Sequence, residues 1–187
     1  MNTKIMNKIL IGISLLGLLV IIFPSTYRWF GRIARWVFVA IMYSRPIRDL
    51  LPKYKILNKI VSVRKGLGVV CGNFALAHGI GYFIFIESSI FDIFTSLDYW
   101  NPTSMLGAGI LATLFIIPPL ITSNNISIKI LKRNWKIVQQ LSYPAFILTG
   151  VHIYLVRHEP LALVVITIYI IIFILAFRKQ KGKLATK

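Results

Sequence analysis

Two histidines, His78 and His152, stand inside apolar stretches that are long enough to cross a membrane. Ionisable side chains are rare at that depth, because moving them from water into hydrocarbon is costly, and those that occur mark ion, proton or cofactor sites. Imidazole also binds metal ions and heme iron. The two residues therefore indicate a metal ion or a heme iron held between helices. The third histidine, His158, is flanked by Arg157 and Glu159 in an expected solvated turn, and we do not predict it as a ligand.

The positions of the two histidines predict that their imidazoles lie at a similar depth. His78 comes 12 residues after Gly66 and His152 comes 15 residues after Ile137, where the two apolar stretches begin. At about 1.5 Å per helical residue, the depths are roughly 18 Å and 22 Å. Two axial ligands on opposite faces of one iron require such a match. The alternative is a helix-packing face in which His78 bonds to a neighbouring helix. The small residues of that face are Gly68, Gly72, Ala75 and Gly79.

The composition identifies an integral membrane protein. The chain has 187 residues, of which 57% are hydrophobic, and a mean hydropathy of +0.75. A soluble domain of this size could not bury so much apolar surface. The net charge of +17 does not indicate a nucleic-acid partner, because the basic residues flank apolar stretches, as in membrane proteins. Cys71 is the only cysteine, so no intrachain disulfide can form.

We expect an all-α membrane protein whose single domain, residues 1–187, is a bundle of six transmembrane helices. About 20 apolar residues cross a bilayer as a helix. The predicted spans are about 9–24, 28–44, 66–86, 104–122, 137–156 and 160–177. The first is expected to remain uncleaved, because no small-residue cleavage site follows it. The second is interrupted by Arg32 and Arg35, and its alternative is an interfacial amphipathic helix, which leaves five spans. Pro144 lies in the fifth span, where proline is tolerated and can kink a helix. Residues 123–135 are expected to form a polar, basic loop.

Charge asymmetry predicts the orientation. With six spans and the N-terminus inside, 18 of the 22 lysines and arginines fall on the cytoplasmic side. Five spans give 19, so charge does not separate the two alternatives. Both place the C-terminus in the cytoplasm. We therefore expect a multi-pass protein of a bacterial-type inner (plasma) membrane, in contact with lipid. Arg32, Arg35 and Arg157 fall outside, where they either pair with heme propionates or extend to lipid headgroups.

The sequence has no motif of a soluble enzyme, such as HExxH, a phosphate-binding loop, GxGxxG or a cysteine pair. A membrane chain without a substrate domain is expected to move electrons rather than to form bonds, because the difficult chemistry then belongs to a cofactor or a partner. We interpret it as an electron-transfer subunit of an oxidoreductase system rather than a complete enzyme. The alternative is a heme-free membrane transporter or assembly subunit, in which the histidines serve packing or proton movement.

Several motifs resemble the ferric reductase-like transmembrane family. The sequence RKGLG at residues 64–68, followed by His78 and Tyr82, is similar to the family's R-K-x-L-G…H-x-x-x-Y helix. Residues 121–123, followed by Trp135, Leu141, residues 143–144 and His152, resemble its next block, L-T-S…W…L-H-R-L-V-Y-P…H. The pattern is most similar to the MsrQ (YedZ) branch, the heme-binding membrane subunits of a periplasmic methionine sulfoxide reductase system. Residues 31–48 look like the second span of that branch, which favours six spans.

The resemblance implies a b-type heme and electron transfer to an extracytoplasmic oxidoreductase or acceptor. His78 and His152 match the family's ligand positions, and Arg64 and Tyr82 match positions of the same helix as His78. Gln139 stands where the family has the histidine of L-H-R. Because glutamine is a poor iron ligand, we expect one heme and electron entry from a membrane quinone. No sequence feature supports a flavin.

Overall fold

The structure, a computed structural model, describes residues 2–87, 91 and 95–185, without the side chains of residues 183–185. The described residues form helices and turns and no strand, which confirms the all-α prediction. The first predicted span, 9–24, corresponds to α1 (Thr3–Ser14), a 3-10 turn (Leu15–Leu18) and α2 (Leu19–Ile22). A second 3-10 turn (Pro24–Thr26) leads into α3 (Tyr27–Leu50).

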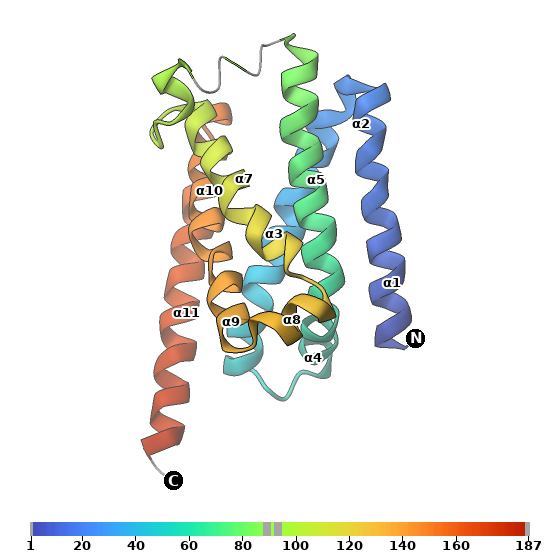
Figure 1. Cartoon of the computed structure of the whole chain (residues 1–187). Coiled ribbons are helices and arrows are strands. Elements are labelled where there is room, and N and C mark those ends of the chain that lie inside the picture. The colour runs from blue at the N-terminus through green and yellow to red at the C-terminus, as the bar shows by residue number, and fades with distance from the viewer. Residues whose placement is uncertain (1, 88–90, 92–94, 186–187) are drawn as a thin grey trace.

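The remaining spans correspond to four further helices. They are α5 (Arg64–Phe85), α7 (Met105–Ile121), α10 (Ser142–Arg157) and α11 (Leu161–Ala185). Figure 1 shows these helices side by side in a bundle, with both chain termini at one end. We call this the terminal end, and the other the far end. Three helices in the described residues are long and apolar enough to cross a membrane, or up to four if α7 counts together with the helix that follows it.

The second predicted span, 28–44, lies within α3. This helix carries five arginines and one aspartate, which explains its low hydropathy. It nevertheless runs within the bundle, between α5 and α11 (Figure 1). Its buried side chains include Ala34, Phe38, Ile41 and Met42. Burial of an apolar stripe on a helix with charged ends is the pattern of a packed helix rather than of one lying on a surface. The predicted second span is thus a helix packed within the bundle.

The chain between α7 and α10 differs from the prediction. Residues 123–135, expected as a loop, contain α8 (Asn125–Leu131) and the start of α9 (Arg133–Gln140). The side chain of Asn124 accepts a hydrogen bond from the amide of Ser127 and so caps α8, which turns 91° from α7. The fifth span breaks at Leu141. Pro144 lies in the first turn of α10, where no helical amide bond is lost, so it begins this helix rather than kinking it.

Two polar contacts fasten α1 to α5. The amide of Gly66 donates to the Asn7 side chain at 2.8 Å. The amide group of Asn73 donates to the Ser14 hydroxyl at 2.8 Å, and Ser14 is almost fully buried. Polar groups in such surroundings hold helices together when their hydrogen bonds are satisfied. The helix α4 (Lys55–Ser62) joins α3 to α5, and it lies with α8 and α9 at the terminal end (Figure 1).

Candidate functional site

The structure brings His78 of α5 and His152 of α10 together. Their ring centroids lie 6.2 Å apart, and the ring planes are inclined by 68°. Each residue lies within about two turns of the far end of its helix. Both side chains are partly buried. The matched depth expected from the sequence therefore corresponds to a direct juxtaposition of two imidazoles, off-centre in the bundle and towards the far end.

The imidazole of His78 packs against a backbone carbonyl and a glycine of α3, which together we call its seat. Nδ1 lies 3.0 Å from the backbone oxygen of Tyr27, and the imidazole stacks on the Tyr27 ring at 5.5 Å. Four residues later, Gly31 faces the same imidazole. A Cβ at this position would lie only 2.7 Å from Nδ1, so the ring occupies the space that a side chain would take. Any residue larger than glycine would therefore push the imidazole away from its carbonyl.

His152 has a seat of the same construction on α7. Its Nδ1 lies 2.8 Å from the backbone oxygen of Met105, and a Cβ on Gly109 would lie 2.9 Å from that nitrogen. Met105 is the first residue of α7, as Tyr27 is of α3, and in both helices the glycine follows four residues later. Sequence reasoning missed both glycines. The spacing was visible, but nothing in the sequence states which neighbour a helical glycine faces.

The two seats fix which nitrogen of each ring carries the proton. A carbonyl oxygen can only accept a hydrogen bond, so Nδ1 of both histidines is the protonated donor. The lone pair then lies on Nε2 of each ring. The structure gives neither Nε2 a hydrogen-bond partner in the described part of the chain. Metal-binding histidines are oriented in this way, with the non-ligating nitrogen bonded to a carbonyl or carboxylate. The pair can thus offer two oriented imidazole lone pairs.

The pair is not part of a larger cluster of metal ligands. Among the residues that the structure describes, no three or more His, Cys, Asp or Glu side chains gather at one point. Cys71 is buried and contacts the backbone oxygen of Ala34 through its sulfur at 3.6 Å. His158 is exposed and ends α10 in a left-handed conformation. Within the described residues, the pair therefore offers two imidazole nitrogens and no further ligand of these types.

The other sequence-predicted residues lie at different distances from the pair. Tyr82 packs edge-on against Tyr27, with centroids 5.8 Å apart, and so adjoins the seat of His78. Arg64 begins α5 at the terminal end, 14 residues before His78 and about 21 Å away along the helix. It therefore does not belong to the histidine pair. Arg32 lies over the ring of Trp29 at 5.0 Å.

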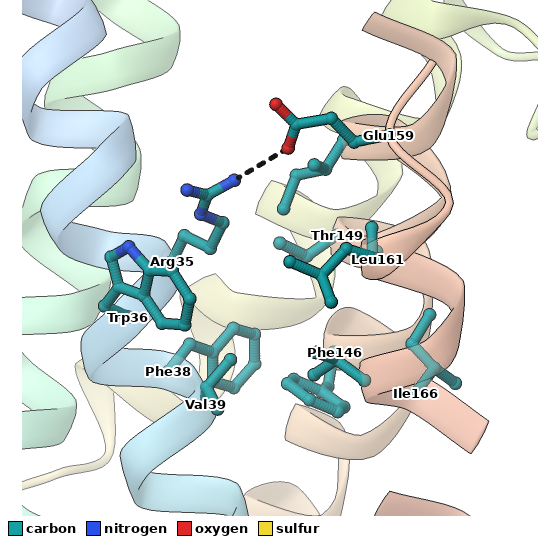
Figure 2. A pocket seen from close by; sticks show the side chains of 13 residues that line it. Arg35, Trp36, Phe38, Val39, Phe146, Thr149, Glu159, Leu161 and Ile166 are labelled. Carbon is teal, nitrogen blue, oxygen red and sulfur yellow. Dashed lines mark ion pairs between the residues drawn. The ribbon is translucent and has the colours of Figure 1, made fainter. Parts of the chain in front are cut away.

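Arg35 reaches towards the loop between α10 and α11. Figure 2 shows its guanidinium pointing to Glu159, and the ion pair measures 3.8 Å from Nη1 to Oε2. Glu159 also binds Nε of Arg157 at 3.0 Å. The Arg35 guanidinium lies over the ring of Trp36, whereas its own Nε is buried without a hydrogen-bond partner among the described residues.

The side chain of Gln139 forms hydrogen bonds with residues at the end of α7. Its side-chain amide donates to the backbone oxygen of Pro119 at 3.1 Å and to the Thr122 hydroxyl at 3.0 Å. Carbonyls in the last turn of a helix lack intrahelical partners, so this residue satisfies one of them. Trp135 does the same for the backbone oxygen of Thr122, at 3.0 Å. Both side chains anchor α9 to α7.

The comparison with protein families agrees with the motifs in the sequence. The family model described as ferric reductase like transmembrane component matches residues 30–150, which is well over half of the chain. The match spans most of α3, all of α5 and α7, and α10 up to Gly150, two residues before His152. No curated protein and no solved structure matches the chain.

Proposed function

The chain belongs to the ferric reductase-like transmembrane family, whose members are membrane electron-transfer components, and we propose that it is a subunit of this kind that binds one heme b. His78 and His152 would hold the heme iron. Electrons would pass from the heme to an extracytoplasmic oxidoreductase or a small acceptor. In this proposal the chain is a subunit of an oxidoreductase system, and the reaction of the final substrate belongs to its partner.

The short distance between the two imidazoles is the observation that carries the proposal. Each metal–imidazole bond measures about 2 Å, so two imidazoles on opposite sides of one ion have ring centroids roughly 6 Å apart. The centroids of His78 and His152 lie 6.2 Å apart. Two nitrogens alone do not satisfy a metal ion held only by protein. They would suffice for a heme iron, whose other ligands belong to the porphyrin itself, and the heme would supply one-electron transfer.

The residues around the pair have roles that follow from their contacts. The backbone oxygens of Tyr27 and Met105 hold the Nδ1 protons, so both Nε2 lone pairs are available to iron. Glycines beneath both rings allow the helices to approach. Of the three arginines expected to bind propionates, Arg157 binds the Glu159 carboxylate and Arg35 lies beside it, whereas Arg32 has no ion pair among the described residues, so we assign Arg32 to a propionate. Tyr82, next to Tyr27, would line the heme edge.

Electron entry from within the membrane is favoured by the surroundings of Gln139. The glutamine bonds to Pro119 and Thr122, so it is committed to helix packing and is not a ligand at the terminal end. One heme near the far end leaves no second heme to receive electrons from a cytoplasmic flavin reductase. We therefore propose a membrane quinol as electron donor, as part of a system similar to the MsrQ (YedZ) branch. The terminal end would face the cytoplasm of a bacterial-type inner membrane.

The same glutamine supports the second candidate, a heme-free membrane transporter or assembly subunit. In that case the family's redox chemistry would have been lost with the ligand that Gln139 replaces, and the histidine pair would serve helix packing or proton movement.

An optical spectrum of the purified protein separates the two candidates. We expect a reduced-minus-oxidised heme b spectrum, with heme content abolished or severely reduced in His78→Ala and in His152→Ala. His158→Ala is the matched control and should retain heme, because this exposed residue lies outside the pair. Normal heme in both of the first two variants would overturn the ligand assignment. A heme-free protein isolated from heme-replete cells would favour the second candidate.

A further inference from the structure

A cavity separate from the histidine pair opens between α3, α10 and α11. Its enclosed volume is about 60 Å³, and most of its lining is apolar. Figure 2 shows Phe38 and Val39 of α3 facing Phe146 of α10 across it, with Leu161 and Ile166 of α11 at its side. The aromatic rings of Phe38 and Phe146 close its floor, with centroids 5.3 Å apart. Neither histidine lines this cavity.

The polar groups of the cavity stand together at its far-end rim. Arg35 and Glu159 face each other there, and Thr149 lies below them (Figure 2). Glu159 reaches this place because His158 adopts a left-handed conformation, with φ of 52°, which turns the chain back over α10. Arg157 binds the same carboxylate without lining the cavity. The rim thus presents one cation and one carboxylate to a molecule below.

Arg35 is incompletely satisfied in this arrangement. Its Nη1 is 3.8 Å from the carboxylate, too long for a hydrogen bond, and its Nε is buried without a partner among the described residues. A buried N–H of a charged group without an acceptor costs free energy comparable to a lost hydrogen bond, so such groups normally have a partner. An acceptor atom inside the cavity would supply it.

One side of the cavity is lined by residues on the outer surface of the helix bundle. Trp36 and Leu161 stand on this side and are 55% and 59% exposed. A molecule that enters here arrives through the bilayer. On its inner side the cavity is lined by Thr149 and Ile153, which lie one turn before His152 and directly after it. An occupant would therefore sit beside the helix turn that carries one of the imidazoles.

We propose that this cavity binds the ring of an isoprenoid quinol, the electron donor named in the proposed function, on which this inference rests. Arg35 donates a hydrogen bond to one ring oxygen. Glu159 accepts a hydrogen bond from a hydroxyl of the reduced form. Because the enclosed volume is smaller than a substituted ring, the ring enters from the open side past Trp36 and leaves its tail in lipid.

A phospholipid fits this rim less well. An acyl chain has no acceptor atom for Arg35, and a phosphate placed there would meet the carboxylate of Glu159. A quinol has both an acceptor and a donor on an uncharged apolar ring, which matches one guanidinium and one carboxylate above an apolar cavity.

The test is a binding titration with decylubiquinone and decylubiquinol on the full-length protein in detergent, read by quenching of tryptophan fluorescence and by native mass spectrometry. Arg35→Gln should weaken binding of both forms by about tenfold or more, because it removes a charged hydrogen-bond donor. Glu159→Gln should weaken the quinol selectively. Arg157→Gln is the matched control, since it contacts the same carboxylate from outside the cavity, and should change either affinity by less than about threefold. Trp36→Phe should remove most of the quenching without removing the mass adduct.

The heme spectrum of the same samples separates this inference from the proposed function. Quinone binding that is unchanged in Arg35→Gln, or a phospholipid as the only adduct lost in that variant, would overturn the inference while leaving the heme assignment intact. A protein without heme that still binds decylubiquinol through Arg35 would overturn the proposed function and leave the binding site standing.

Discussion

Replacing Gly31 or Gly109 by alanine should weaken heme binding without altering an iron ligand. In Gly31→Ala the new methyl group would lie 2.7 Å from Nδ1 of His78, whereas ordinary contacts begin at 3.4 Å. The imidazole or its helix must therefore move by about 0.7 Å, which exceeds the roughly 0.2 Å by which metal–ligand distances normally vary. In Gly109→Ala the methyl group lies 2.9 Å from Nδ1 of His152. Changes of this kind around a metal-binding histidine typically cost 10- to 100-fold in metal affinity, and we expect a loss of about that size in each variant.

The matched control is Gly79→Ala. This glycine directly follows His78, but a Cβ there would meet no atom within 4 Å. Its substitution should preserve heme and stabilise α5 by up to about 1 kcal/mol, because alanine favours helix more than glycine does. The assay is heme per protein, measured by pyridine hemochrome after purification, with thermal unfolding to show that each variant is folded. Equal heme retention in all three variants would refute the role of the seats, as would loss of heme in Gly79→Ala alone.

Two further predictions concern orientation and stoichiometry. Both Lys53 and Leu97 are exposed, and charge asymmetry places them on opposite sides of the membrane. In a Cys71→Ser background, Lys53→Cys should therefore be protected from an impermeant thiol reagent on intact cells, and Leu97→Cys should be labelled. The reverse labelling pattern would show that the predicted orientation is inverted. Pyridine hemochrome should give one heme per chain. Gln139→Ala should leave that number unchanged while lowering the free energy of unfolding by about 1 kcal/mol, because the two hydrogen bonds from Gln139 to the end of α7 are lost. Two hemes in the unmodified chain would contradict the single-site interpretation.

The parts of the fold that the sequence predicted are those fixed by local periodicity. Helical rise alone gives the depth of His78 and His152, and the apolar lengths place the helices that carry them. The rotation of each helix about its axis depends on packing against distant parts of the chain. The short distance between the two rings could therefore only be found in the structure. The resemblance to the ferric reductase-like family did predict that His78 and His152 act together, because both match ligand positions of that family.

Residues whose role depends on a distant neighbour were not predictable. Gly31 and Gly109 resemble any glycine in a membrane helix until the ring that fills each seat is known. Pro144 was placed inside a continuous span, but the break at Leu141 comes before it and places it in the first turn of α10. Arg35 was expected either at a propionate or at lipid headgroups, and its contact with Glu159, which depends on the left-handed turn at His158, was not foreseen.

The off-centre position of the histidine pair has a consequence for how the protein would respond to an energised membrane. Between the pair and the terminal end the bundle is filled by the aromatic side chains of Phe38, Phe146 and Tyr169, and Gln139 serves packing there. A charge moved across the full bilayer would gain or lose about 2.3 kcal/mol per 100 mV. If donor, heme and acceptor all lie in the outer half, little charge crosses that field. Turnover would then be nearly electroneutral, with a rate indifferent to uncouplers and with no contribution to the membrane potential.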